Sequence, residues 1–210
     1  LWDDAANRKL VVQHYPQHLK MFDDYPASIY RADVARLLYL HRYGGVYLDL
    51  DFACLQPLDD LLATGDFLLA PQFPDRRCPH CPEADVYANA FLAAPPHHPF
   101  TSFLITKLNM STRQRSVLGA TGPRFLTAAL RSWEGAGGTG VRKLSFCDIY
   151  GATYNEEQSC SGDTEAAIRD CAVRFPTRKT HSFWFTSWAL KRARLHNFSS
   201  CAPPRGSHRH

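Results

Sequence analysis

The sequence predicts an α/β fold in which a mostly parallel sheet is flanked by helices. Residues 27–43 carry apolar side chains at helical spacing, residues 46–52 alternate between apolar and polar, and residues 67–70 form a short apolar run. The first pattern is typical of a helix, and the other two are typical of strands. Because strands that alternate with helices usually build a parallel sheet, we expect this architecture.

The composition agrees with one globular domain. Of the 210 residues 45% are apolar, and 24 basic against 20 acidic side chains give a formal net charge of +4. Disordered chains have fewer apolar residues and a higher net charge, and a membrane span needs about 20 apolar residues in a row. The sequence fits neither class, and it is long enough to bury a core.

The first predicted helix leads directly into the first predicted strand. Ser28 can cap the helix Ala27 to Tyr43, and Gly44-Gly45 ends it. In the following strand, Val46 to Phe52, the even-numbered residues are apolar, whereas Tyr47, Asp49 and Asp51 alternate with them. We therefore expect both carboxylates to emerge from the same side of the sheet.

Further elements follow in the second half. A helix is expected from Pro99 to Leu108 and another from Phe125 to Leu130, before a strand-like stretch from Val141 to Phe146. Gly135, Gly137 and Gly140 have the spacing of a dinucleotide-binding fingerprint, but that motif needs a strand before it and a helix after it. Here the order is reversed, so we interpret the glycines as a turn.

Cysteine and histidine motifs give weaker signals. Cys78-Pro79-His80-Cys81 is half of a zinc site without a second half, and a loop disulfide or two thiols is the preferred interpretation. His97-His98 lies between prolines and is expected at the surface. Seven cysteines and the glycosylation triplets at Asn109 and Asn197 weakly favour a secretory compartment.

Charge is unevenly distributed along the chain. After Asp170 there are eight basic and no acidic residues. Such a basic end can face an anionic ligand such as a diphosphate, can face an anionic membrane surface, or can be a solvated tail. For Arg205 to His210 we expect the tail.

The candidate chemistry lies at the end of the first strand. Asp49 and Asp51 form a D-x-D pair, and because buried carboxylates are costly, a divalent cation is the simplest explanation for them. On the preceding helix Asp33 and Arg36 are three residues apart and share a face. A carboxylate can accept from sugar hydroxyls and a guanidinium can hold phosphate oxygens, but without context a surface ion pair is the preferred interpretation of Asp33 and Arg36.

Together these motifs resemble glycosyltransferases whose sugar-binding region contains a D-x-D motif, a group that includes inositol-phosphoceramide mannosyltransferases and the initiating outer-chain mannosyltransferase of fungi. The resemblance extends from Leu1 to about Trp188. It rests on Asp33 and Arg36, Tyr43-Gly44-Gly45-Val46-Tyr47-Leu48-Asp49-Leu50-Asp51, Asn89-Ala90-Phe91, His98-Pro99-Phe100, Thr121-Gly122-Pro123, and His181 with Ser187-Trp188.

The resemblance implies a metal-dependent, retaining transfer of a hexose from GDP-mannose or a UDP-hexose to a glycolipid or glycan acceptor. The fold would be a Rossmann-like GT-A domain with Mn²⁺ or Mg²⁺ as cofactor and no nucleic-acid partner. Asp49 and Asp51 would be catalytic and would bind the metal with His181, while Asp33, Arg36, Asn89, Ser187 and Trp188 would bind the donor. No residue declares itself as a covalent nucleophile; Asp148 and Asp163 are candidates by type alone.

Two departures from the family pattern are expected to matter. The family's usual N-terminal strand, Ile-Pro-Lys-Ile-Ile-His-Gln-Trp in type, is missing, so residues 1–190 would be one N-terminally incomplete catalytic domain and residues 191–210 a basic tail. A Golgi location and membrane attachment through a segment outside this sequence are expected. Either Trp184 or Trp188 can match the family's final tryptophan.

Two alternatives remain open. One is a sugar-nucleotide-binding pseudoenzyme on the same fold. The other is a haloacid-dehalogenase-type phosphatase, in which a D-x-D at the end of a strand supplies an aspartyl nucleophile and an acid/base with Mg²⁺. The phosphatase pattern needs Thr or Val where Ala53 stands, followed by downstream carboxylates, and the final 40 residues contain none.

Overall fold

The structure, a computed structural model, describes residues 3–72, 86–111, 116–150, 173 and 179–182. Among these residues the elements follow in the order α1 (Asp4–His14), the short 3₁₀ helix η1 (Pro16–His18), α2 (Leu19–Asp24), α3 (Ser28–Tyr43), β1 (Gly45–Leu48), β2 (Phe52–Cys54), α4 (Asp59–Leu62), β3 (Phe67–Pro71), β4 (Tyr87–Ala94), α5 (Pro99–Ser111), α6 (Val117–Ala120), α7 (Pro123–Gly135), β5 (Val141–Lys143), α8 (Phe146–Ile149) and β6 (Thr180–Ser182).

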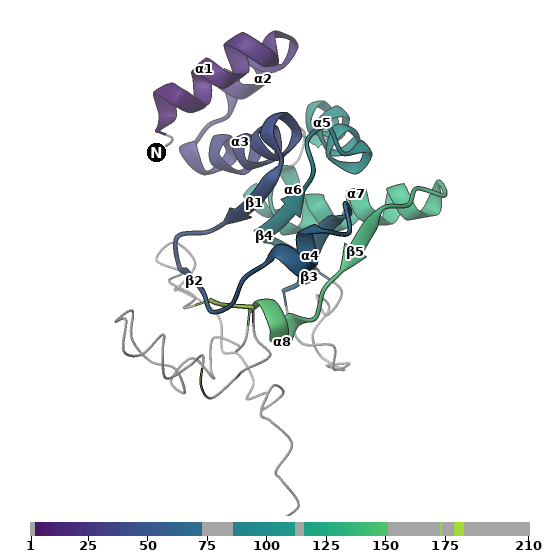
Figure 1. Ribbon diagram of the computed structural model, residues 1–210. Coiled ribbons are helices and arrows are strands. Elements are labelled where there is room, and N and C mark those ends of the chain that lie inside the picture. The colour runs from purple at the N-terminus through teal and green to yellow at the C-terminus, as the bar shows by residue number, and fades with distance from the viewer. Residues whose placement is uncertain (1–2, 73–85, 112–115, 151–172, 174–178, 183–210) are drawn as a thin grey trace, which may run out of the picture.

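A four-stranded mixed sheet organises the fold (Figure 1). Its order is β1-β4-β3-β5, and β4 is antiparallel to both of its neighbours, whereas β5 is parallel to β3. The α/β prediction is confirmed, but the prediction of a mostly parallel sheet is wrong. Helices α5–α7 supply the crossover that a parallel β5 needs. The alanine-rich sequence of β4 has low strand propensity. The sequence patterns therefore did not predict this strand or its position between β1 and β3.

Two apolar cores cover the two faces of this sheet. The helix-side core joins α1, α2, α3, α5 and α7 to Phe67, Leu69 and Leu92. The second core joins α8 and Tyr150 to Leu68 and Phe91 on the other face. Odd and even residues of β3 thus pack on opposite faces, as the strand period requires.

The predicted strand 46–52 is wrong beyond Leu48. Asp49 N–H still donates to Ala90 O at 2.9 Å, but then Phe52 N–H donates to Asp49 O at 3.2 Å and closes a turn. After the turn, β2 pairs antiparallel with β6 in a separate two-stranded sheet. A local alternation of residues cannot reveal such a distant partner. The expectation that both carboxylates follow one strand face therefore does not hold.

Most of the predicted helices are confirmed with adjusted ends. Helix α3 spans the predicted residues, but Ser28 is its first residue and Ala27 its N-cap, without a side-chain hydrogen bond. The prediction that His98 lies at the surface is wrong: it is buried with its ring 6.0 Å from that of Phe67, and its Nδ1 accepts from Phe100 N at 3.1 Å in the first turn of α5. His97 is exposed as predicted. Gly137 and Gly140 lie in the turn between α7 and β5, with positive φ.

Within the described ranges, no helix combines the length and apolar character that crossing a membrane requires.

We predict that Gly44→Ala destabilises the fold. Gly44 has φ +67° and ψ −163°, a region almost restricted to glycine, and an added Cβ would lie 2.5 Å from Pro96 Cδ. The free energy of unfolding in urea should fall by roughly 1–3 kcal/mol. The matched control is Gly135→Ala at the end of α7, where a Cβ meets nothing within 4 Å. Equal stability of the two variants would contradict this role of Gly44.

Candidate active site

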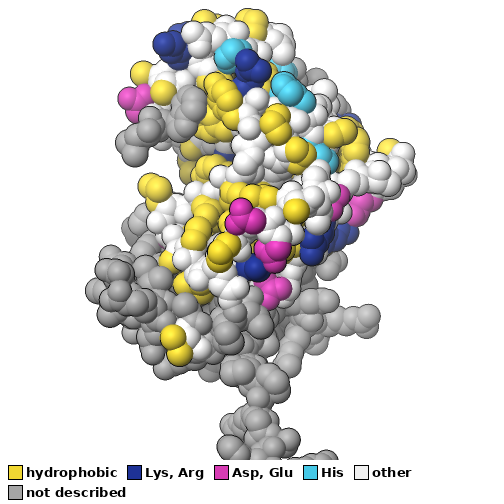
Figure 2. Space-filling view, in the orientation of Figure 1, with side chains coloured by type: hydrophobic (Ala, Val, Ile, Leu, Met, Phe, Trp, Pro, Cys, Tyr) yellow, Lys and Arg dark blue, Asp and Glu magenta, His cyan; other side chains and the backbone are white. Residues whose placement is uncertain are grey.

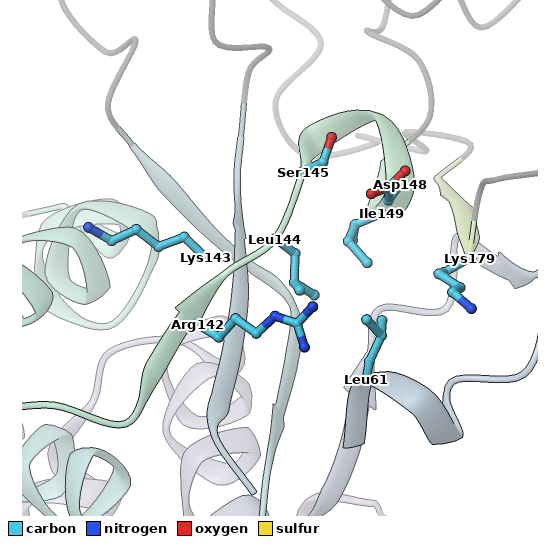
Figure 3. A pocket seen from close by; sticks show the side chains of 8 residues that line it. All are labelled: Leu61, Arg142, Lys143, Leu144, Ser145, Asp148, Ile149 and Lys179. Carbon is cyan, nitrogen blue, oxygen red and sulfur yellow. The ribbon is translucent and has the colours of Figure 1, made fainter. Parts of the chain in front are cut away.

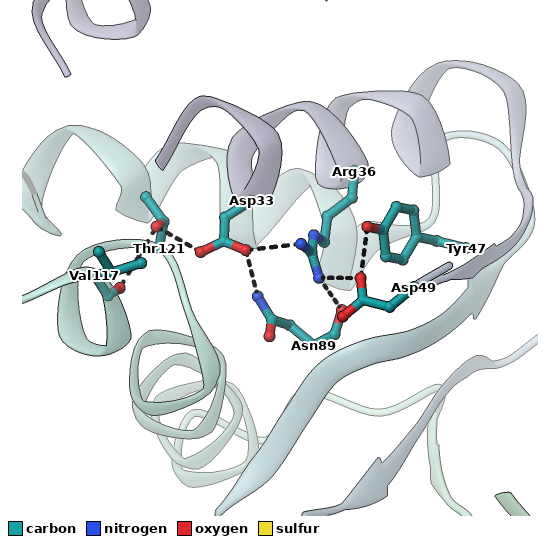
Figure 4. Close-up of polar contacts among 7 residues, drawn as sticks. All are labelled: Asp33, Arg36, Tyr47, Asp49, Asn89, Val117 and Thr121. Carbon is teal, nitrogen blue, oxygen red and sulfur yellow. Dashed lines mark hydrogen bonds and ion pairs between the residues drawn. The ribbon is translucent and has the colours of Figure 1, made fainter. Parts of the chain in front are cut away.

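The predicted site residues come together at one edge of the sheet. Strands β1, β3 and β5 run in the same direction and β4 in the opposite one, so the carboxyl ends of three strands and the start of β4 share that edge. Asp49 follows β1 there, and Asn89 lies near the start of β4. Helix α3 passes behind them with Asp33 and Arg36 (Figure 4). Ligands of α/β proteins commonly bind at this edge.

Arg36 is the centre of the polar network. Its Nη2 lies 2.9 Å from Asp33 Oδ1, and its Nη1 lies 3.3 Å from Asp49 Oδ1 and donates to Asn89 O at 2.6 Å. The side chains of Arg36 and Asp33 are only 6% and 5% exposed. Interpreting them as a surface ion pair is therefore wrong, because the guanidinium is buried and bridges α3 to the D-x-D segment.

Tyr47 supports the same arrangement from β1. The guanidinium carbon of Arg36 lies 4.4 Å from the centre of its ring, and its hydroxyl donates to Asp49 Oδ1 at 2.7 Å. Burial raises the pKa of Tyr47 well above its ordinary value, so the phenol keeps its proton and remains a donor. Asp49 is thus oriented by two donors on one of its oxygens.

Asp33 is held from three directions. Besides Arg36, Asn89 Nδ2 donates to Oδ1 at 2.9 Å and Thr121 Oγ1 donates to Oδ2 at 2.9 Å. Burial raises the pKa of Asp33, while Arg36, Thr121 and Asn89 act in the opposite direction. Burial also acts to lower the pKa of Arg36, but the charges of Asp33 and its neighbours outweigh it and raise that pKa.

Thr121 was not among the predicted site residues. It is 2% exposed and lies between α6 and α7, so its hydroxyl connects this helical segment to α3. The sequence feature that could have identified Thr121 as a site residue is its position in Thr121-Gly122-Pro123, directly before a helix that begins with proline.

An irregularity in β4 directs Asn89 towards α3. Phe91 packs in the second core and Leu92 in the helix-side core, so strict alternation would place Asn89 on the second-core face. Instead Ala88 packs on that face and Asn89 bonds Asp33. The register between β3 and β4 shifts between Leu69 and Pro71, which marks the bulge. Bulges often redirect a side chain next to a functional site.

The D-x-D carboxylates provide oxygen ligands of the kind that Mn²⁺ and Mg²⁺ take. Asp49 Oδ2 makes no hydrogen bond or ion pair with the described residues, and the Asp49 side chain is 37% exposed. Asp51 lies two residues further on, directly before β2. In the described part of the chain, no three His, Cys, Asp or Glu side chains are grouped as metal ligands. The residues present fit a cation that is completed by other ligands.

The remaining predicted residues are only partly within the described ranges. The backbone of His181 lies in β6, opposite Ala53 of β2, and so beside the D-x-D turn. Asp148 lies in α8. The residues that lie outside the described ones are Ser187, Trp188, Trp184, Asp163, Cys78, Cys81 and the Asn197 triplet.

Comparison with known proteins agrees with the motifs. Residues 1–68 match the family described as "Glycosyltransferase sugar-binding region containing DXD motif". The chain is 33% identical over 132 residues to inositol phosphoceramide mannosyltransferase 1 of Schizosaccharomyces pombe, covering 60% of this chain and 38% of that protein. It is 32% identical over 139 residues to mannosyl phosphorylinositol ceramide synthase CSH1 of Saccharomyces cerevisiae, covering 64% and 34%. The chain thus spans little more than a third of the length of these relatives.

Among solved structures, the fold is similar to two toxin domains. One is the UDP-bound glycosyltransferase domain of the YGT toxin, with TM-score 0.41 and 13% identity over 68% of this chain and 49% of that one. The other is the PaToxG glycosyltransferase, with TM-score 0.36 and 16% identity over 61% and 52%.

We predict that Thr121→Val lowers the free energy of unfolding by about 1–3 kcal/mol, because a buried carboxylate loses a donor. Thr121→Ser should retain most of the wild-type stability. Thr101→Val is the matched control, since Thr101 is fully buried and its hydroxyl has no hydrogen-bond partner among the described residues. Chemical denaturation measures all three. A loss in Thr101→Val as large as in Thr121→Val would argue against a specific bond to Asp33.

Proposed function

We propose that this chain carries the donor site of a glycosyltransferase, because residues 1–68 match the family of glycosyltransferase sugar-binding regions that contain a DXD motif. It transfers a hexose from a nucleotide-sugar donor, GDP-mannose or a UDP-hexose, to a glycolipid or glycan acceptor. The observation that carries the proposal is the buried bridge from Asp33 through Arg36 to Asp49. This bridge fixes the partly exposed Asp49 carboxylate at the edge of the sheet where β1, β3 and β5 end.

The relatives favour a mannosyl donor and a lipid acceptor. Their names describe mannosyl transfer and an inositol phosphoceramide product or substrate. We extend this class to the present chain, with residues 1–190 as the catalytic domain and 191–210 as a basic tail. A Golgi location and membrane attachment of the full-length protein belong to the same proposal.

The donor residues divide into two groups in this proposal. Asp49 and Asp51, with His181 as a third ligand, hold a divalent cation against the donor diphosphate. Asp33, Arg36 and Asn89 form the wall against which the ribose and the transferred sugar lie, and Ser187 and Trp188 close over the diphosphate. The buried Arg36 Nε–H, which makes no hydrogen bond with the described residues, supports a role towards a bound hydroxyl.

Preorganisation explains how these residues assist transfer. As the bond from the anomeric carbon to the diphosphate breaks, negative charge develops on the leaving oxygen, and fixed positive groups stabilise it without having to reorganise. A bound Mn²⁺ or Mg²⁺ supplies Lewis-acid stabilisation of that oxygen. Arg36, Tyr47 and Asn89 keep Asp33 and Asp49 in place throughout. Retention of configuration is part of the proposal, by a front-face or a covalent route.

Titration calorimetry tests the donor site directly. We predict that the chain binds one of GDP-mannose, UDP-galactose, UDP-glucose and UDP-N-acetylglucosamine when Mn²⁺ is present, and loses that binding when the metal is chelated. Asp51→Asn should abolish the metal-dependent binding and leave the thermal transition unchanged. Unchanged Mn²⁺-dependent affinity in this variant would refute the site assignment. Donor binding without any transfer would favour the pseudoenzyme alternative.

We also predict that Tyr47→Phe weakens metal-dependent donor binding roughly tenfold, because Asp49 loses a hydrogen bond that orients it. The phenyl ring keeps its place against the Arg36 guanidinium, so only one contact is removed. Tyr30→Phe is the control: Tyr30 stacks on Tyr25 with ring centroids 5.4 Å apart and lies outside the network. Calorimetry with the same donor measures both variants, and equal affinities would assign Tyr47 a packing role alone.

A further inference from the structure

A second polar site lies beside the D-x-D segment and is not used by the network around Arg36. It is a cavity of about 160 Å³ between β5, α8, α4 and the residue that precedes β6 (Figure 3). Figure 2 shows acidic, basic and apolar side chains next to one another on the face that carries α4 and β5. The cavity residues used here are Arg142, Asp148, Lys179, Leu61, Leu144 and Ile149.

The charges in this cavity are not paired with one another. Arg142 reaches between the apolar side chains of Leu61 and Leu144 (Figure 3), and its guanidinium makes no hydrogen bond or ion pair with the described residues. The Asp148 carboxylate likewise has no such partner within the described ranges, although its side chain lines the same cavity. Lys143 is different, because its Nζ lies 2.7 Å from Glu134 Oε1 and Figure 3 shows it directed away.

Asp148 is also partly desolvated. Burial raises the pKa of its carboxyl group, and the nearby charge of Lys179 opposes that rise only in part. Lys179 is itself engaged, since its Nζ lies 2.9 Å from Asp60 Oδ2. The cavity therefore presents a guanidinium and a carboxylate that face a common space, with an ammonium at its side and aliphatic groups beneath.

This combination selects for hydroxyl groups. A hydroxyl donates to a carboxylate and accepts from a guanidinium, and a polyol ring presents several of them together with C–H groups that pack on aliphatic side chains. A phosphate has acceptors only, and Asp148 would repel it. The size agrees, because a nucleotide sugar needs a larger site than 160 Å³, of the order of 300–1,000 Å³ for ordinary ligand pockets.

The cavity and the D-x-D segment lie at the same edge of the sheet, where β1, β3 and β5 end. Strand order β1-β4-β3-β5 separates them by three inter-strand steps, which amounts to about 14 Å at 4.7–4.9 Å a step. They are also linked by packing: Tyr150 follows α8, and its ring centroid lies 5.4 Å from that of Phe52, the residue after Asp51. A donor sugar that extends from the D-x-D segment along this edge would point towards a ring in the cavity.

From these observations we propose that the cavity formed by Arg142, Asp148 and Lys179 binds the polyhydroxylated ring of the acceptor, an inositol or hexose headgroup. This assignment rests on the proposed transferase function, which it extends from the donor to the acceptor.

The test separates acceptor from donor effects. With myo-inositol and methyl α-mannoside as acceptor probes, Arg142→Gln and Asp148→Asn should each raise the acceptor KM by about ten- to hundredfold. Donor affinity should stay at the wild-type value in both variants, and the slow transfer of the donor sugar to water should stay at the wild-type rate in Arg142→Gln. Arg42→Gln, at an exposed arginine near the end of α3, is the control and should change none of these quantities.

Direct binding of the two probes to the wild-type chain, measured by saturation-transfer NMR, tests the cavity even if no transfer occurs. Loss of the signal in Arg142→Gln supports the assignment, and its persistence overturns it. An unchanged acceptor KM in both variants overturns it too, while leaving the donor site intact. Binding of inorganic phosphate in place of either probe would make the cavity an anion site and refute the polyol assignment. Failure of the wild-type chain to bind any donor would refute the proposed function and with it the acceptor role, whereas the NMR signal would still show whether the cavity binds a polyol ring.

Discussion

The structure of the candidate site depends on one buried guanidinium. Arg36 is almost inaccessible to water, and a charge in that position persists only if it is paired and hydrogen-bonded. Asp33, Asp49 and the carbonyl of Asn89 satisfy it, and these groups belong to α3, to the end of β1 and to β4. Losing the Asp33 carboxylate would break a buried ion pair, at a cost of roughly 3–5 kcal/mol, and moving either of the other two groups would remove a hydrogen bond or a second ion pair. Arg36 therefore fixes the relative positions of three elements at once.

The mixed sheet provides the places that this network needs. Because β4 runs antiparallel between β1 and β3, its beginning lies at the same edge as their ends, and Asn89 stands beside Asp49. In an all-parallel sheet the start of a strand would lie at the opposite edge. The bulge that turns Asn89 towards α3 completes the arrangement, since an unbroken pleat would place its amide on the second-core face.

Sequence patterns predicted what depends on neighbours along the chain. The apolar spacing of residues 27–43, the glycines after it and the run at residues 67–70 predicted α3, its end and β3, and the spacing of Asp33 and Arg36 predicted their shared face. What failed depends on distant partners. Residues 52–54 pair with β6, β4 is held by two neighbouring strands although its alanines favour no strand, and Thr121 reaches Asp33 across 88 positions. The burial that turns Asp33 and Arg36 from a weak ion pair into a structural bridge exists only in the folded chain.

The two polar sites at this edge differ in how their charges are satisfied. Around Arg36 the charges are balanced within the protein, so the geometry is complete before a donor arrives, as electrostatic preorganisation requires. In the cavity, Arg142 and Asp148 carry opposite charges and yet are not paired with each other. Because Arg142 is exposed and Asp148 only partly buried, a salt bridge between them would add little stability. Both groups instead stay available to a ligand, and a ring of hydroxyl groups provides donors and acceptors for both.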